Sequence, residues 1–454
     1  MSVRTPALER AVLALQHVPV GDPAAREHVA ALRGALIAAS DGGDEERLRF
    51  LRVLDGLDLD GAQVDDALAR MRVAIDRPSR RRAAARLRVA LEPTRNAVLR
   101  HLEKEPGGLQ LLIDLRAALL ELLDTHRDAS DLDALDDELR AFLAERFDVG
   151  GLELRRLTWR DSAALLERLA RAEAVHTVRG WFDLKDRLDD DRRVYAFFHP
   201  ALPDVPLVFI EVALTEEFPS TMRAILNLEA PRSDVRNARN AVFYSISNCE
   251  PGLGGIPFGN ALIKRVVDRL REELPKLRSF ATFSPLPGFR AWLREIDETL
   301  PAELREALAS PGWHRNERLI AQVDEPLTRL AARYVLESKR DDGAPRDPVA
   351  RFHIGNGATV DRICFLADRT ERGIKQSFGT MVSYRYALDR IGDNQVAYAL
   401  DHRVDASGAV AALAAEAPGA AALVPPSRAR AMLAALRRFA SRVMPRRAAR
   451  ATSA

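Results

Sequence analysis

The chain has 454 residues, of which 47% are apolar and 30% charged, and its formal net charge is +2. Such a composition is typical of an ordinary globular protein, and the length predicts two or three domains. The small net charge excludes a dominant attraction to nucleic acid or to an anionic membrane surface. Two cysteines, Cys249 and Cys364, are too few for a disulfide framework or a paired metal site, and they favour a reduced compartment.

Targeting and membrane signals are not evident in the sequence. No stretch approaches the ~18 uninterrupted apolar residues that a membrane span needs. The first residues lack the basic and apolar regions of a secretory signal, and the final Ala-Thr-Ser-Ala is not a peroxisomal address. We therefore expect a cytoplasmic protein with no membrane span and no nucleic-acid partner.

The first part of the chain, residues 1–148, has the pattern of a helical bundle. Between residues 109 and 123 leucines and isoleucine recur with a period of about 3.6 residues, which predicts an amphipathic helix. Glycine and proline interrupt the pattern at residues 42–43, 56, 78, 106–108 and 150–151. We find no catalytic constellation here and expect this domain to serve scaffolding and self-association.

The pattern changes after Gly151. Four short stretches rich in aromatic and β-branched residues predict strands, at 193–200, 205–214, 241–247 and 278–283. A helical pattern over 260–274 separates two of them. Strands mixed with helices predict an α/β or α+β domain, which we bound at 149–401. The remainder, 402–454, is an alanine- and arginine-rich extension. Residues 430–443 have the pattern of a basic amphipathic helix, which we expect to be exposed to solvent.

A glycine-rich segment, 248–260, follows a predicted strand and opens the predicted helix. Its glycines permit close backbone approach to a ligand, and a helix N-terminus favours a phosphate. Lys264 and Arg265 lie in the first turns, where a bound polyanion would offset their unfavourable interaction with the helix dipole. The segment lacks the ending of a P-loop and the dinucleotide fingerprint, so an ordinary strand–helix turn is an equal alternative.

Two further segments carry candidate acid–base residues. Ser284 ends a predicted strand just before Pro-Leu-Pro-Gly, which predicts a sharp, stiff loop, although a plain Ser-Pro turn is the simpler interpretation. His353 lies beside Gly-Asn-Gly, where a proton-transfer histidine at the end of a strand is possible. Tyr384 and Tyr386 would share one face of a later strand. The other histidines show no metal-ligand spacing, so we expect no metal site.

These segments together resemble the malonyl-CoA decarboxylase family. The resemblance rests on RRLTWRDSAALLERLARAEAVHTVRGWFDLKDRL (155–188), FYSISNCEPGLGGIPFGNALIKRVV (243–267), FATFSPLPGFRAWL (280–293) and HIGNGATVDRICFLADRTERGIKQSFGTMVSYRYAL (353–388), in the family's order. It covers residues 150–390, and the helical part is similar to the family's bundle in a less specific way.

The resemblance implies an N-terminal helical bundle that mediates homo-oligomerisation, followed by a GNAT-like (acyl-CoA N-acyltransferase-like) mixed α/β catalytic domain. It implies a carboxy-lyase that converts malonyl-CoA to acetyl-CoA and CO2 without a cofactor, because the thioester itself accepts the electrons of the broken bond. The catalytic residues would be Ser284 and His353, with Asn356 and Tyr386 in support. The substrate-binding residues would be Ser245, Gly254, Gly255, Ile256, Pro257, Phe258, Gly259 and Asn260.

One departure from the family pattern concerns Pro257. Part of the family carries an acidic residue at this position, so a contact made by that carboxylate does not transfer to this chain. The fold class leaves two other functions open. The first is an acyl-CoA-dependent acyltransferase, which would need a site for an acceptor amine, and the second is a non-catalytic CoA-binding protein.

Overall fold

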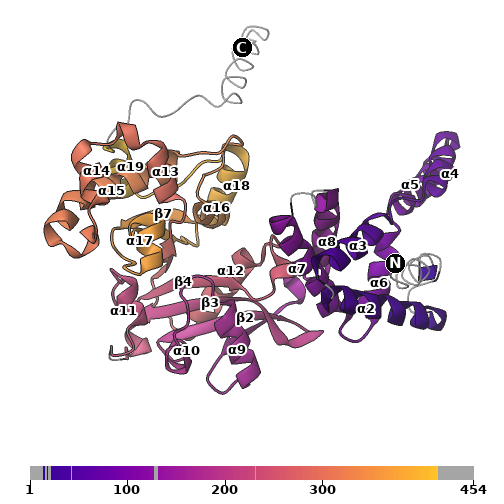
Figure 1. Ribbon diagram of the computed structural model, residues 1–454, viewed down its shortest axis with the longest axis horizontal. Coiled ribbons are helices and arrows are strands. Elements are labelled where there is room, and N and C mark those ends of the chain that lie inside the picture. The colour runs from indigo at the N-terminus through magenta and orange to yellow at the C-terminus, as the bar shows by residue number, and fades with distance from the viewer. Residues whose placement is uncertain are drawn as a thin grey trace, which may run out of the picture.

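The computed structural model describes residues 14–15, 18, 22–41, 43–126, 131–230 and 232–417. N-terminal helices lie at one end of the molecule, a mixed sheet in the middle and C-terminal helices at the other end (Figure 1). The expected basic helix at 430–443 lies outside the described residues. In the described part of the chain, no helix is long and apolar enough to cross a membrane.

The part before residue 152 is helical, as the periodicity predicted. Its helices are η1 (Pro23–Ala25), α2 (Arg26–Asp41), α3 (Asp44–Asp55), α4 (Gly61–Val73), α5 (Arg77–Ala90), α6 (Arg95–Lys104), α7 (Gly108–Thr125), α8 (Asp133–Arg146) and η3 (Val149–Gly151). Asp60 and Asp76 cap the N-termini of α4 and α5, which form a hairpin that projects from the body (Figure 1).

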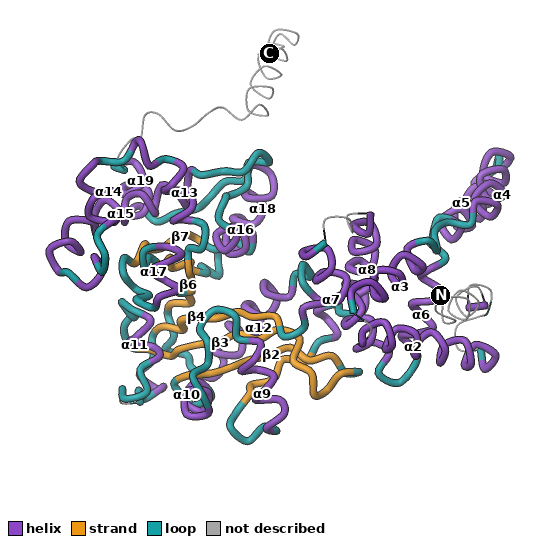
Figure 2. Tube along the Cα trace, viewed as in Figure 1, coloured by secondary structure: helices purple, strands orange, loops and turns teal. Residues whose placement is uncertain are grey.

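Eight strands form one sheet in the order β1-β2-β3-β4-β5-β8-β6, and β7 pairs with β8. Figure 2 shows the strands between the two helical ends. The strands are β1 (Glu153–Leu157), β2 (Arg192–His199), β3 (Leu202–Thr215), β4 (Asn240–Asn248), β5 (Ser279–Thr282), β6 (Ser284–Pro285), β7 (Thr359–Cys364) and β8 (Met381–Arg385). All four strands expected from the sequence are present, and a helical part followed by a mixed, GNAT-like sheet is confirmed.

Helices cover both faces of the sheet and extend beyond it. The first group is α9 (Ala163–Ala172), α10 (Trp181–Arg187), α11 (Met222–Leu226), η4 (Val235–Asn237), η5 (Pro251–Leu253) and α12 (Phe258–Glu273). The second is α13 (Phe289–Glu295), η6 (Asp297–Thr299), α14 (Ala302–Ala309), η7 (Trp313–Arg315), α15 (Glu317–Glu337), α16 (Pro348–Gly355), α17 (Glu371–Ser377), α18 (Ile391–Asp401) and α19 (Gly408–Ala415). The amphipathic α12 packs its apolar face on one side of the sheet, and α9 and α10 pack on the other.

The sheet opens at its centre. Strands β4 and β5 are its one parallel pair among the described strands, and their pairing ends at Phe243 and Thr282. The chain after Thr282 pairs instead with β8, Ser284 lying opposite Val382. The last residues of β4 therefore have no strand beside them on that side. This opening places a cavity in the middle of the sheet.

The domain boundaries expected at residues 148/149 and 401/402 stay a prediction. The largest apolar core is continuous from the N-terminal helices into the sheet. At the other boundary, Val360 of β7 forms a bridge with Ala406, and Val410 and Ala414 of α19 are buried in the same core. Residues 402–417 thus pack against the sheet-containing part.

Candidate active site

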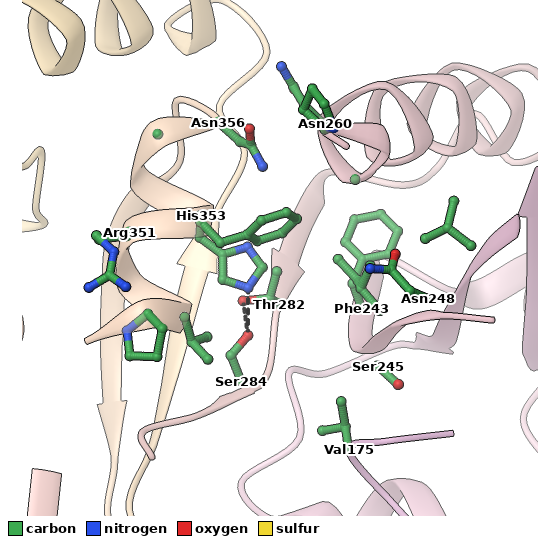
Figure 3. A pocket seen from close by; sticks show the side chains of 18 of the residues that line it. Val175, Phe243, Ser245, Asn248, Asn260, Thr282, Ser284, Arg351, His353 and Asn356 are labelled. Carbon is green, nitrogen blue, oxygen red and sulfur yellow. Dashed lines mark hydrogen bonds between the residues drawn. The ribbon is translucent and has the colours of Figure 1, made fainter. Parts of the chain in front are cut away.

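A cavity of about 640 Å³ lies where β4 and β5 separate. Its walls come from the second half of β4, the start of α12, the segment at Thr282–Pro285 and α16 (Figure 3). Of the substrate-binding residues expected from the sequence, those that line it are Ser245, Gly255, Ile256, Pro257, Gly259 and Asn260. The size is within the range of small-molecule sites in proteins.

Two of the expected residues lie behind the wall. Phe258 is buried and its ring packs edge-on against Phe147 from the helical part, with 6.4 Å between the ring centroids. The carbonyl oxygen of Gly254 accepts a hydrogen bond from the guanidinium of Arg116 on α7 at 2.7 Å. Both residues support the loop rather than face the cavity.

Ser284 and His353 meet at the cavity wall. The hydroxyl oxygen of Ser284 lies 3.1 Å from Nε2 of His353, and the two residues are 6% and 4% exposed (Figure 3). Burial lowers the pKa of His353 to about 3. The imidazole is therefore neutral at pH 7, and it carries one N–H donor and one acceptor nitrogen.

Two tyrosines hold the imidazole of His353. The hydroxyl of Tyr386 lies 2.9 Å from Nδ1, and the ring of Tyr384 stacks on the imidazole with 4.7 Å between the centroids. Tyr384 lies in β8 and Tyr386 just beyond its last residue, and both side chains contact the same imidazole ring. That the two tyrosines share one face of a strand stays a prediction. Burial raises the pKa of the Tyr386 hydroxyl, so this group keeps its proton.

His353 lies on helix α16, and its expected place at the end of a strand is wrong. Asp347 caps this helix by accepting hydrogen bonds from the N–H groups of Val349 and Ala350 at 2.9 and 3.0 Å, and Pro348 is its first residue. Gly357, with φ +83°, follows the helix end. An Asp-Pro start and a glycine end are helix signals that outweigh the short apolar run between them.

Asp347 also connects the two candidate catalytic segments. Its carboxylate accepts the N–H of Gly288 at 3.3 Å, in the loop that follows Ser284. A Cβ at Gly288 would overlap the hydroxyl of Tyr334, so only glycine fits there. The sharp loop expected from Pro-Leu-Pro-Gly is thus fixed to the N-terminus of the helix that carries His353.

Ser245 and Asn356 line the cavity but make different contacts from Ser284. The hydroxyl of Ser245 donates to Oε2 of Glu173 at 2.6 Å. A β-bulge sets this orientation, because Ser245 pairs with Glu211 and Phe243 with Val212, which leaves Tyr244 as the extra residue. The Asn356 side chain points toward the cavity from the end of α16 (Figure 3). Its backbone N–H donates to the carbonyls of Phe352 and His353 at 3.1 and 3.2 Å, and the supporting role expected for its side chain stays a prediction.

The cavity wall carries almost no charge. Among the described residues that line it, Arg351 is the single one with a permanent charge, and its guanidinium donates to the carbonyls of Pro345 and Arg346 at 3.1 and 2.7 Å. Arg265, expected near a bound polyanion, instead donates to the carbonyl of Leu152 at 2.6 Å. No group of three or more potential metal ligands occurs in the described part of the chain.

Sequence reasoning missed several residues of this site. Thr282 lines the cavity and accepts a hydrogen bond from Ser284 at 2.9 Å. The signal was present, because residues two apart on a strand share a face. Glu173 could not be found this way, since nothing in its local sequence indicates that it meets a serine 72 residues later.

Comparisons with protein families identify one family over most of the described chain. The family description "Malonyl-CoA decarboxylase C-terminal domain" matches residues 150–423, and "Malonyl-CoA decarboxylase N-terminal domain" matches residues 58–147. The chain is 36% identical over 354 residues to the mitochondrial malonyl-CoA decarboxylase of Anser anser anser, covering 72% of this chain and 70% of the relative. It is 35% identical over 364 residues to that of Rattus norvegicus, covering 74% of each.

Solved structures give the same result. The malonyl-CoA decarboxylase of Agrobacterium vitis superposes with a TM-score of 0.81 at 37% identity, covering 90% of this chain and 99% of that one. The enzyme of Rhodopseudomonas palustris superposes with a TM-score of 0.79 at 37% identity, covering 89% and 98%.

Proposed function

We propose that this chain, which belongs to the malonyl-CoA decarboxylase family, converts malonyl-CoA into acetyl-CoA and CO2. One observation carries the proposal beyond family membership. Ser284 and a neutral His353 lie 3.1 Å apart at the wall of a cavity large enough for the acyl end of a CoA thioester. Such a pair can deliver a proton to a carbon atom by general acid catalysis.

The chemistry of the substrate sets what the site must do. The malonyl carboxylate is β to a thioester carbonyl, so loss of CO2 leaves the enolate of acetyl-CoA. The thioester is the electron sink, and we propose that no cofactor is required. The protein must orient the breaking C–C bond, stabilise the enolate oxygen and deliver a proton to the α-carbon.

The neutral wall supports this reaction. Decarboxylation moves negative charge from the carboxylate to the thioester oxygen. A cation on the carboxylate would stabilise the ground state more than the transition state and would slow the reaction. Arg351, the charged residue at the wall, already bonds to two backbone carbonyls. A malonyl group beside Ser284 would therefore meet hydroxyl and imidazole groups rather than a cation.

We infer that the proton reaches the α-carbon through Ser284. The Ser284 hydroxyl gives its proton to carbon and takes one from Nε2 of His353. The enolate thereby becomes acetyl-CoA, and the negative charge passes to the His353 ring, which becomes an imidazolate whose Nδ1 accepts the hydrogen bond of Tyr386 until water returns the proton. Asn356, at the end of α16, would bind the substrate at the mouth of the cavity.

The remainder of CoA would extend from the cavity to the start of α12. Pro257 precedes α12 and gives no side-chain cap. The N–H of Phe258 donates to the carbonyl of Ile256 at 2.9 Å, so the next two N–H groups, those of Gly259 and Asn260, are the ones that a phosphate would meet. Gly255, Gly259 and Asn260 line the cavity beside them. The binding energy of CoA would then orient the malonyl group at Ser284.

We also propose that the helical part mediates self-association into a homo-oligomer. The hairpin of α4 and α5 exposes three large apolar side chains, Val73 at 74%, Ile75 at 88% and Val89 at 68%. Exposed apolar groups on a projecting element are typical of interaction surfaces. Light scattering on the Val73→Ser/Ile75→Ser variant tests this, and an unchanged oligomer mass would exclude the tip of the hairpin from the interface.

The compartment also stays a proposal. The sequence predicts the cytoplasm, whereas the relatives from Anser anser anser and Rattus norvegicus are mitochondrial malonyl-CoA decarboxylases.

The test of function uses purified protein treated with a chelator. The protein is incubated with malonyl-CoA, and acetyl-CoA is followed by mass spectrometry. We expect steady conversion that survives chelation and is lost in His353→Gln, but not in the control variant His126→Gln on the surface of the helical part. Malonyl-CoA that binds without turnover would refute a decarboxylase and would direct attention to acyl transfer, tested by adding candidate amine acceptors.

A further inference from the structure

We propose that Thr282 is a further catalytic residue, whose hydroxyl donates a hydrogen bond to the thioester oxygen as the enolate forms. The inference rests on the proposed decarboxylase function and adds to it the group that stabilises the developing negative charge. Neither Ser284 nor His353 is free for this task if they handle the proton.

The position of Thr282 is set by the opening of the sheet. It is the last residue of β5, at the point where β4 and β5 stop pairing, and it is 1% exposed while lining the cavity. It lies two residues before Ser284, so both hydroxyls face the same side (Figure 3). Phe283, between them, points into the apolar core on the opposite side.

The hydrogen bonds of Thr282 leave its proton for a ligand. Its oxygen accepts the hydroxyl of Ser284 at 2.9 Å and the backbone N–H of Tyr384 at 3.1 Å. A hydroxyl has two lone pairs and one proton, so these two bonds occupy both lone pairs. Within the described chain, the structure records no acceptor for the Thr282 proton. This proton is thus available to an acceptor bound in the cavity that Thr282 lines.

The same pattern fixes the direction of a longer chain of hydrogen bonds. Ser284 gives its proton to Thr282, so Nε2 of His353 must be the N–H that donates to Ser284. Nδ1 is then the acceptor of the hydrogen bond that the Tyr386 hydroxyl donates. All donors therefore point from Tyr386 toward Thr282 while the enolate forms, and the Ser284 hydroxyl turns from Thr282 to the α-carbon when it gives up its proton. Hydrogen bonds aligned in this way polarise one another and strengthen the last donor.

The geometry matches the atoms of an enolate. The oxygens of Ser284 and Thr282 are 2.9 Å apart. The α-carbon and the oxygen of a thioester are separated by two bonds, so adjacent hydroxyls can reach both atoms of one bound molecule. The other serine hydroxyl at the wall, that of Ser245, already gives its proton to Glu173. Thr282 is consequently the hydroxyl that is placed beside Ser284 and has its proton unused.

The experiment compares Thr282→Val, which keeps the shape but removes the hydroxyl, with Thr282→Ser, which keeps the hydroxyl. Removing one donor to an oxyanion typically lowers kcat by about 100- to 1,000-fold. We expect that loss in Thr282→Val with KM changed only a few-fold, and recovery of most of the rate in Thr282→Ser. Thr380→Val is the matched control, because Thr380 is fully buried and its hydroxyl has no partner among the described residues.

A second measurement forms the same enolate without loss of CO2. Acetyl-CoA is incubated with each protein in D2O, and deuterium uptake at the α-carbon is followed by mass spectrometry. We expect Thr282→Val to lose this exchange and Thr282→Ser to keep it. A role limited to fixing the fold would lower the melting temperature without this selective loss.

Each outcome decides a different point. Wild-type protein that produces no acetyl-CoA from malonyl-CoA refutes the proposed function itself. If the wild type is active and Thr282→Val is equally active, the role of Thr282 is overturned and the proposed function stands. The same holds if Thr282→Val raises KM but exchanges deuterium at the normal rate. Should Thr282→Val fail to fold, Thr282→Ala removes the hydroxyl without the second methyl group, and the same two outcomes apply.

Discussion

The guanidinium of Arg116 donates a hydrogen bond to the carbonyl oxygen of Gly254 at 2.7 Å, across 138 residues of sequence. The same side chain donates to the carbonyl of Gly252 at 2.8 Å and forms an ion pair with Asp136 at 2.8 Å. A Cβ at Gly252 would overlap the carbonyl of Ile113, so α7 and the glycine loop are in direct backbone contact. The helical part thereby supports the loop proposed to bind CoA.

Arg116→Lys is expected to weaken substrate binding. A lysine keeps the charge but cannot reach two carbonyls and a carboxylate with one compact ammonium group. Hydrogen bonds from charged donors contribute about 1.5–3 kcal/mol each, and part of this loss would fall on the loop that holds CoA. We expect KM for malonyl-CoA to rise about tenfold with kcat changed less.

Steady-state kinetics check this expectation against Arg70→Lys. Arg70 is half exposed and pairs with Asp66 on its own helix, a kind of ion pair that contributes little to stability. If Arg116→Lys kept a wild-type KM, the helical part would have no effect on the CoA site through this contact.

Gly259→Ala is expected to impair binding without loss of stability. A Cβ at this position would overlap the ring of Phe352, which lines the cavity beside His353. Alanine is preferred to glycine in a helix by about 1 kcal/mol, so the melting temperature should not fall. The displaced ring should enter the cavity and raise KM about tenfold.

The double variant Gly259→Ala/Phe352→Ala separates this explanation from others. It removes the ring and should return KM toward that of Phe352→Ala alone. Gly392→Ala serves as the control, because a Cβ there would meet nothing within 4 Å. A Gly259→Ala enzyme with normal KM would mean that the Phe352 ring leaves the cavity free.

The strands were predictable because their residues carry the signal locally. The stretch expected at 193–200 is β2 at Arg192–His199, and the helix expected at 260–274 is α12 at Phe258–Glu273. α12 shows apolar periodicity because it buries one face, whereas β2 is buried on both faces and was recognised by its aromatic and β-branched residues. His353 was assigned wrongly because the helix start at Asp347 and Pro348 was not weighed.

The site could be predicted only as far as the family motifs extended. Ser284 and His353 are 69 residues apart, and no local pattern indicates that β8 brings their segments together. The direction of Ser245 depends on a bulge at Tyr244, which the alternation of residue types does not record. Arg265 illustrates the same limit, since its nearest acceptor is the carbonyl of a residue 113 positions earlier.

The rate should not depend on a histidine titration near neutral pH. Burial lowers the pKa of His353 to about 3, so the imidazole is neutral from pH 5 to pH 8. If the neutral ring is the active form, kcat at saturating malonyl-CoA is flat over that range. Measurements in buffers of constant ionic strength test this. An acidic limb with a midpoint near 6.5 would contradict a neutral His353.

The stability of Glu211→Gln relative to wild type is expected to rise with pH. Burial raises the pKa of Glu211 to about 8, with the negative Glu173 adding to the effect of burial and Arg187 opposing it. The folded state then binds more protons than the unfolded state between the ordinary carboxyl pKa and pH 8, so wild-type stability falls as pH rises through this window. The slope is at most about 1.4 kcal/mol per pH unit.

A glutamine has no proton to lose, so the variant should not show this decline. Urea unfolding at pH 5 and pH 8 measures it, with the exposed Glu216→Gln as the control. We expect the stability of Glu211→Gln relative to wild type to increase from pH 5 to pH 8, and that of Glu216→Gln to stay constant. If the free energy of unfolding of Glu211→Gln differed from that of wild type by the same amount at both pH values, Glu211 would already be ionised in the folded protein. The guanidinium of Arg187, 3.2 Å away, would then hold it in that form.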